Sequence, residues 1–218
     1  MGNPRHFTVK KLVLLAMLAA VSYLIVSLIR VPVVLFLSYE PKDVIITMGG
    51  FLLGPMASFL ISLVVSLVEM VTISSTGPIG GLMNLLSTCA FSCTAAIVYK
   101  KRHTMAGAIW GLGLGSVTMI AVMLLWNWLI TPLYMGVSRD TVAAMLLPVF
   151  LPFNLLKAFL NSAFFLMLYK PLVSALRKTG LVAAKPVRQG SAKAGVYLLA
   201  AGLLVSCIFL LLVLQGKL

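Results

Sequence analysis

LPVFLPFNLLKAFLNSAFFLMLY, residues 147–169, is the stretch of sequence that decides the fold. It is long enough to cross a bilayer as one helix, since a spanning helix needs roughly 20 mostly apolar residues. The run nevertheless contains Lys157, and a lysine near the bilayer centre costs on the order of 3 kcal/mol. On a helix that turns about 100° per residue, Asn154, Lys157 and Asn161 lie on one face. We therefore predict a membrane helix with a polar stripe that faces a partner or water.

The composition of the whole chain predicts a polytopic membrane protein. Of 218 residues, 61% are hydrophobic and 10% are charged, and the mean hydropathy is +1.12, which is outside the range of ordinary soluble domains. The net charge of +13 does not indicate nucleic-acid binding, because 12 of the 17 basic residues lie in three clusters beside apolar runs. The positive-inside rule assigns these clusters, and with them the N-terminus, to the cytoplasm. The clusters are Arg5, Lys10 and Lys11, then Lys100, Lys101 and Arg102, then Lys170, Arg177, Lys178, Lys185, Arg188 and Lys193.

Apolar runs divide the chain into expected helices. Spans are predicted at 12–29, 56–73, 79–99, 105–130 and 147–169, and a shorter run at 44–53 reaches or nearly reaches the inner face. A seventh run, 194–214, is long enough to span and contains no charge. The predicted fold is an all-α polytopic membrane protein. Its expected parts are a membrane domain at 1–178, a basic cytoplasmic linker at 179–193 and an extra transmembrane helix at 194–215.

The connections between these runs carry the acidic residues and the turn signals. Prolines 32 and 41 resist helix formation, so the segment 30–42 is predicted to be an outer loop, and Gly54-Pro55 is predicted to be an inner turn. The four acidic residues are expected at or near the outer face. We expect Glu69 to be either an interfacial acid or a partner of Lys157. The acidic residues are Glu40, Asp43, Glu69 and Asp140.

Small residues in the spans indicate close helix packing. Ala16 and Ala20 form a small-xxx-small pair on the first span, which allows either an intramolecular helix or another protein to approach closely. Four glycines in the fifth span, at 107, 111, 113 and 115, predict a packing groove rather than a dinucleotide site, because no strand precedes them.

Polar side chains from three spans are expected at one depth in the outer half of the membrane. Asn84, Asn127, Asn154 and Lys157 each lie within about one to three helical turns of the same boundary. Two interpretations remain open at this point. Apolar walls with a few placed amides are typical of a ligand pocket, and the amides suit a neutral ring that carries N–H and C=O groups. Alternatively, Lys157 pairs with Glu69 or Glu40 in a purely structural network.

The sequence offers little support for catalysis or for a metal site. It contains no phosphate-binding G-x-x-x-x-G-K-[ST] motif and no G-x-S-x-G elbow. No histidine shares a span with a carboxylate, and the cysteines within the spans lie near no other metal ligand. We therefore predict that the chain is not an enzyme and that it binds no metal.

Several segments together resemble a known family, the substrate-binding S-components of energy-coupling-factor (ECF) vitamin transporters, in particular the riboflavin-binding members. The resemblance covers residues 10 to about 178. The segments that carry it are Ala16-x-x-x-Ala20, Tyr39-Glu40-Pro41-Lys42-Asp43, residues 75–84, residues 127–136 and Leu151-Pro152-Phe153-Asn154-Leu155-Leu156-Lys157.

This resemblance implies a six-helix bundle whose outer half holds one riboflavin as transported ligand, with no cofactor. The family's polar contacts map onto Glu40, Asn127, Asn154 and Lys157, and the segment from Gly77 and Pro78 to Asn84 is expected to line the pocket. The alternatives are an S-component for thiamin or biotin and a structural membrane subunit without a ligand.

The same resemblance implies partners and a location. Ala16 and Ala20 would face a membrane-embedded coupling subunit, the T-component, which is carried by two cytoplasmic ATPases. The loaded protein would reorient in the lipid bilayer and release the vitamin inward. The expected location is the plasma membrane of a prokaryote. The seventh apolar run departs from the six-helix pattern of the family.

Overall fold

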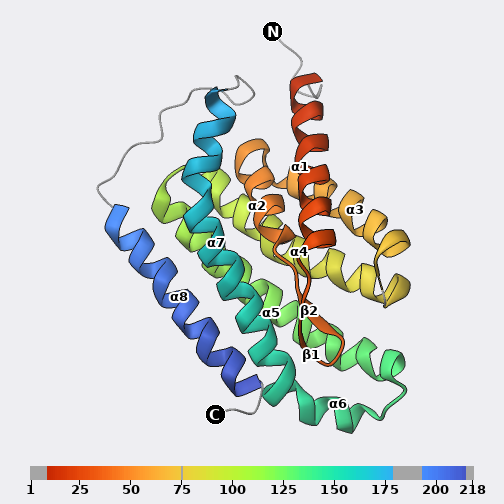
Figure 1. Ribbon diagram of the computed structural model, residues 1–218. Coiled ribbons are helices and arrows are strands. Elements are labelled where there is room, and N and C mark those ends of the chain that lie inside the picture. The colour runs from red at the N-terminus through yellow and green to blue at the C-terminus, as the bar shows by residue number, and fades with distance from the viewer. Residues whose placement is uncertain (1–8, 75, 179–192, 215–218) are drawn as a thin grey trace.

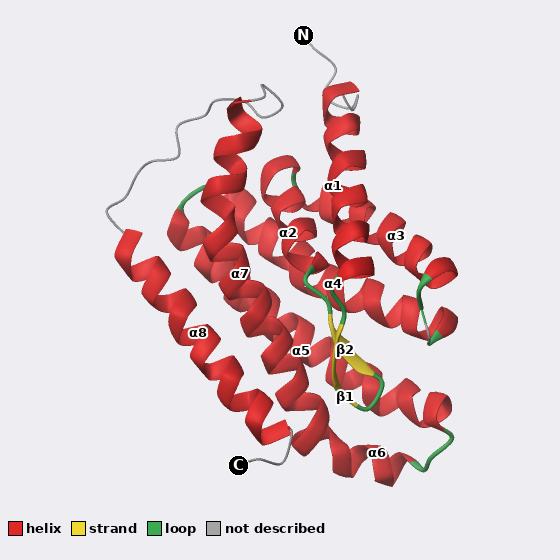
Figure 2. Cartoon of the chain, in the orientation of Figure 1, coloured by secondary structure: helices red, strands yellow, loops and turns green. Residues whose placement is uncertain are grey.

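The computed structural model describes residues 9–74, 76–178 and 193–214, and within them it is a bundle of long helices with one small hairpin (Figures 1 and 2). Six helical segments are long and apolar enough to cross a membrane, namely α1, α3, α4, α5, the α6–α7 segment and α8. This confirms the predicted all-α membrane fold. The elements are α1 (Val9–Leu28), β1 (Val31–Val34), β2 (Leu37–Tyr39), α2 (Lys42–Leu53), α3 (Pro55–Thr72), α4 (Gly77–Lys101), α5 (Met105–Met135), α6 (Arg139–Met145), α7 (Leu151–Lys178) and α8 (Lys193–Leu214).

The segment predicted as an outer loop contains the hairpin β1–β2, and its last residues belong to a helix. The two strands pair antiparallel, and Leu35 between them has a positive φ of 51°. The loop prediction was wrong for Lys42, which begins α2, and for Asp43, which lies in its first turn; both side chains are fully buried. Acidic and basic side chains are ordinary signals of a solvent-exposed loop, and here they are satisfied by each other and by neighbouring helices.

Helix α2 is the short run at the centre of the bundle (Figure 1). Its 12 residues extend only about 18 Å, and ten of them are buried. It ends at Gly54, whose φ of 103° favours glycine, and Pro55 begins α3. The predicted Gly54-Pro55 turn is therefore confirmed.

Glycines bring α4 and α5 into close contact. A Cβ atom on Gly111 would lie 2.7 Å from the Ala95 carbonyl oxygen, and one on Gly115 would lie 2.5 Å from that of Phe91. The predicted packing groove on the fifth span is thus present at Gly111 and Gly115, but not at Gly113, which faces open space, or at Gly107, whose neighbour is Arg102. The span itself runs five residues beyond its predicted end and passes through Pro132 before it ends at Gly136, in the left-handed conformation.

The stretch predicted as one span at 147–169 is the middle of a longer, interrupted segment. A π-helical turn, Leu146–Phe150, joins α6 to α7. Pro148 and Pro152 have no backbone N–H to donate, so the regular i to i−4 pattern cannot run through this point. Such wide turns are frequent at functional sites.

The end of the bundle opposite the hairpin is closed by aromatic side chains. Phe51 on α2 stacks on Tyr99 of α4, with ring centroids 4.2 Å apart, and also contacts Phe165 of α7. Helix α8 packs along α7 (Figure 1), and Val196, Ala200 and Cys207 form its buried side. The run predicted at 194–214 is therefore a helix, whereas the predicted linker at 179–193 lies outside the described residues except for Lys193.

Candidate functional site

The polar stripe on α7 faces α2 and α4. The Lys157 Nζ lies 3.2 Å from Asp43 Oδ2, and it also donates to Ser87 Oγ over 3.2 Å. The partners proposed from sequence, Glu69 and Glu40, were wrong. The correct partner is a carboxylate that the sequence placed in a loop.

Asp43 is the centre of this group of side chains. Its Oδ1 accepts from Thr88 Oγ1 at 2.7 Å, and its Oδ2 accepts from Asn161 Nδ2 at 3.2 Å. Asn161 in turn accepts from the Tyr39 hydroxyl at 3.1 Å. Burial, and then the Asp43 carboxylate, raise the pKa of Tyr39, so this hydroxyl keeps its proton and remains a donor. We call these six residues the Lys157 cluster: Tyr39, Asp43, Ser87, Thr88, Lys157 and Asn161.

A second group of charges surrounds Lys42 on the adjacent side of α2. Its Nζ lies 2.6 Å from Glu40 Oε2 and also contacts Glu69 Oε2. Arg30 Nε approaches Glu40 Oε1 at 3.1 Å, and Asn84 donates to both carboxylates at 3.4 Å. We call these five residues the Lys42 cluster: Arg30, Glu40, Lys42, Glu69 and Asn84. Glu69 was predicted to be an interfacial acid or a partner of Lys157, and it is neither, since it is buried and paired with Lys42.

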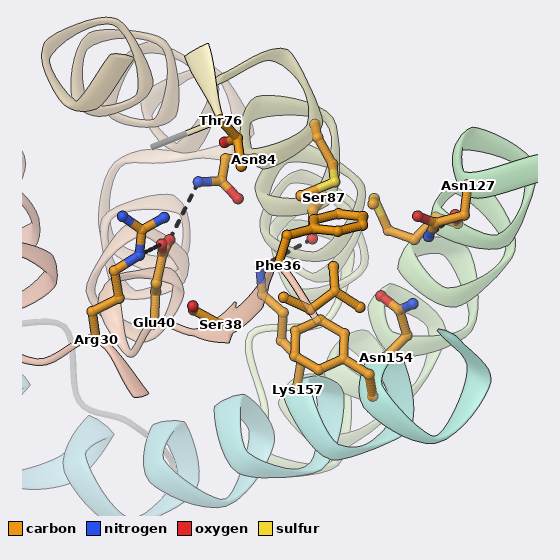
Figure 3. Close-up of a pocket in the computed structure, with 14 residues that line it drawn as sticks. Arg30, Phe36, Ser38, Glu40, Thr76, Asn84, Ser87, Asn127, Asn154 and Lys157 are labelled. Atoms are coloured by element: carbon orange, nitrogen blue, oxygen red, sulfur yellow. Dashed lines mark hydrogen bonds and ion pairs between the residues drawn. The ribbon is translucent and has the colours of Figure 1, made fainter. Parts of the chain in front are cut away.

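A cavity, partly open to the outside, lies between the two clusters and α5. Figure 3 shows Glu40, Asn127, Asn154 and Lys157 approaching it from three sides. Its walls combine these polar groups with apolar side chains from the hairpin, α4, α5 and α7. Its lining residues include Arg30, Phe36, Glu40, Asn127, Asn154 and Lys157.

The two asparagines are held in place by their own helices. Asn127 Nδ2 donates to the Met123 carbonyl at 2.7 Å, and Asn154 Nδ2 donates to the Phe150 carbonyl, at the end of the π-helical turn, at 2.7 Å. An amide nitrogen has two N–H groups and an amide oxygen accepts twice. Each asparagine therefore keeps capacity for a ligand while its orientation is fixed.

The structure brings together five of the seven predicted ligand residues: Glu40, Asn84, Asn127, Asn154 and Lys157 all line the cavity. Gly77 and Pro78 begin α4, and the neighbouring Thr76 lines the cavity instead of them. Ala16 and Ala20 are exposed on α1, so the small-residue pair makes no tight contact within the described bundle. A binding role for each of these residues remains a prediction.

Sequence reasoning missed Phe36, Ser87 and Asp43 as parts of the site. Phe36 lies near the hairpin tip and contacts Tyr134 of α5, with ring centroids 5.2 Å apart. Ser87 is one turn beyond Asn84 on α4, a spacing that places both on one face. This i+3 spacing from Asn84 could have indicated Ser87. For Asp43, no periodic spacing from a predicted site residue indicates a role.

Known proteins with similar sequences give a consistent result. The family model described as "ECF transporter, substrate-specific component" matches residues 10–169. The riboflavin transporter RibU of Staphylococcus aureus (strain TCH60) is 26% identical, over 78% of this chain and 93% of that protein. The riboflavin transporter FmnP of Bacillus subtilis (strain 168) is 24% identical, over 74% of this chain and 90% of that protein.

A solved structure is also similar. It is described as the S component of a bacterial ECF transporter, and it matches 77% of this chain and 98% of its own, with 26% identity and a TM-score of 0.66. The family is a transporter component and not an enzyme, and its likeness here includes the fold as well as the sequence. This chain belongs to the substrate-specific components of ECF transporters.

Proposed function

We propose that the chain binds riboflavin in the cavity between α4, α5, α7 and the hairpin, and that it captures this vitamin for uptake. The observation that carries the proposal is the convergence of Glu40, Asn127, Asn154 and Lys157 on one cavity that is also lined by apolar side chains. Ligand pockets combine apolar side chains with a few placed polar groups that fix the orientation of the ligand. The names of the similar S. aureus and B. subtilis proteins support riboflavin as the ligand.

The chemistry of the lining suits a flavin. Its ring system is flat and apolar on both faces, so it would lie among side chains such as Phe36, Met83 and Phe153. Its polar edge carries N–H and C=O groups, which the amides of Asn127 and Asn154 can meet as both donors and acceptors. The hydroxyl groups of its side chain would then reach Glu40 and Lys157.

The experiment is a titration of the purified, detergent-solubilised full-length chain with riboflavin, followed by quenching of flavin fluorescence. We expect saturable binding at sub-micromolar riboflavin, with yellow protein when it is purified from cells. Competition by thiamin or biotin, without any response to riboflavin, would instead assign another vitamin. No binding of any of the three would favour a structural subunit.

We further propose that uptake uses the family's coupling subunit and two ATPases, with the N-terminus in the cytoplasm and the cavity in the outer half of the membrane. The basic clusters at the ends of the spans support this orientation. Ala16 and Ala20 are exposed on α1, and their small side chains allow another helix to approach closely.

Replacing both Ala16 and Ala20 with leucine tests whether this surface of α1 docks against the coupling subunit. We expect riboflavin affinity to stay at the wild-type value while riboflavin uptake by cells falls strongly, because the added side chains keep the coupling subunit away. Ala201→Leu, at an exposed position on α8, is the matched control and should leave uptake unchanged. Normal uptake by the double variant would place the docking surface elsewhere.

A further inference from the structure

The charged groups around the cavity are balanced in number. Three cationic side chains and three carboxylates form the two clusters: Arg30 and Lys42 with Glu40 and Glu69, and Lys157 with Asp43. Only Arg30, Glu40 and Lys157 of these line the cavity. The carboxylates of Asp43 and Glu69 lie behind its wall.

Each cation that reaches the cavity is already paired with a carboxylate. Arg30 lies 3.1 Å from Glu40 (Figure 3), and Lys157 lies 3.2 Å from Asp43. An ammonium group has three N–H donors, and those of Lys157 meet Asp43 and Ser87 and leave one for the cavity. Lys157 can therefore donate a hydrogen bond to a ligand, but its charge is compensated.

We infer that Asp43 and Glu69 select a neutral ligand over an anionic one, although neither carboxylate lines the cavity. This inference rests on the proposed function. It concerns the difference between riboflavin, which is neutral, and its phosphate ester FMN, which is an anion. A phosphate group carries about −1.5 to −2 charges at neutral pH. It loses its hydration on entering the cavity, and a balanced wall supplies no spare positive charge to replace that hydration.

The effect of the two carboxylates extends beyond contact distance. Charges within a protein interact over about 10 Å with little screening by salt, because the medium between them is less polar than water. Removing one buried carboxylate therefore leaves a net positive charge that acts on a phosphate anywhere in the cavity. The other partners of Asp43, Thr88 and Asn161, are neutral and do not compensate for the change.

The test uses Asp43→Asn and Glu69→Gln, two nearly isosteric changes that each remove one negative charge. Dissociation constants for riboflavin and for FMN are measured on the full-length protein by flavin fluorescence quenching. We expect the ratio of the FMN constant to the riboflavin constant to fall by about tenfold in each variant. The double variant Asp43→Asn/Lys157→Met restores the charge balance, and its ratio should return towards that of the wild type.

Thr88→Val is the matched control, since it removes a hydrogen bond to Asp43 without changing any charge. A purely structural role for Asp43 would weaken both ligands equally in Asp43→Asn and leave the ratio unchanged. If Asp43→Asn does not fold, Glu69→Gln decides alone, because Lys42 keeps Glu40 as its partner. Riboflavin binding with an unchanged ratio would overturn the inference and indicate steric exclusion of FMN. Failure of the wild type to bind riboflavin would instead overturn the proposed function.

Discussion

The Lys42 cluster and the Lys157 cluster both place a lysine in the interior of the bundle, and they differ in how that lysine meets the cavity. Lys42 is completely enclosed, lies between two carboxylates and does not line the cavity. Lys157 has one carboxylate behind it, and its ammonium group reaches the cavity wall. The first arrangement joins the hairpin, α2 and α3, whereas the second presents a donor to a ligand.

A buried charge is therefore not in itself a sign of a binding residue. Lys42 is paired in the interior and does not line the cavity, so it presents no N–H group to a ligand. Lys157 is also paired, yet its position on the wall leaves one N–H group available. What separates the two roles is access to the cavity, which depends on the packing of α4, α5, α7 and the hairpin.

The largest expected effect is that of Lys42→Met on stability. Removing one partner from a buried ion pair typically costs about 3–5 kcal/mol, and here two carboxylates lose their shared cation. Glu69 is affected most, since its Oε1 has no hydrogen-bond partner in the described structure. Thermal unfolding of the detergent-solubilised protein without ligand measures the loss.

Two further variants sharpen this result. Lys100→Met, at an exposed position at the end of α4, should unfold at the wild-type temperature. Adding Glu69→Gln to Lys42→Met should recover part of the lost stability, because only one carboxylate then lacks its cation. If Lys42→Met alone is as stable as the wild type, the Lys42 cluster is not what joins the hairpin to α2 and α3.

The same comparison explains how much could be predicted from the sequence. Lys157 stands out because it is the one charged residue in the stretch 147–169, and its stripe with Asn154 and Asn161 follows from helical periodicity alone. Lys42 and Asp43 follow a proline in a short, charge-rich segment, which is the usual pattern of a loop. Local pattern therefore predicted the helices and four polar residues of the cavity, which are Asn84, Asn127, Asn154 and Lys157.

The partners of these charges could not be predicted from the sequence, because they depend on contacts between distant segments. Lys157 and Asp43 are 114 positions apart by their residue numbers, and no periodicity relates them. The hairpin was missed for a similar reason, since its strands of four and three residues are too short to show an alternating pattern. The exposed Ala16 and Ala20 were identified as a packing pair, but whether they faced inward or outward required the fold.

The second expected effect is that of Lys157→Met, which should reduce riboflavin affinity more than stability. A hydrogen bond to a charged group contributes about 1.5–3 kcal/mol, and the ligand loses one such bond. The folded state is less affected than in Lys42→Met, since Thr88 and Asn161 still donate to Asp43. Fluorescence titration and thermal unfolding, carried out on the same preparation, separate the two quantities. If Lys157→Met binds riboflavin with wild-type affinity, Lys157 does not donate to the ligand, and its role does not differ from that of Lys42.

The smallest expected effect, and the most selective, is that of Asn154→Leu. It removes a polar group from the cavity wall, which should weaken riboflavin binding by about 1–3 kcal/mol, or roughly 5- to 150-fold. Stability without ligand should hardly change, because among the described residues the side chain donates to the carbonyl of Phe150, four residues earlier on the same segment.

Asn161→Leu provides the matched comparison on the same stripe. Asn161 is as deeply buried as Asn154 but does not line the cavity, and its amide joins Tyr39 to Asp43. We therefore expect the reverse pattern, with lower thermal stability and a smaller change in riboflavin affinity. Equal losses of affinity in the two variants would mean that the stripe acts as one structural unit. Opposite patterns would mean that a single helical face is divided, with a ligand-binding residue at Asn154 and a structural residue two turns away at Asn161.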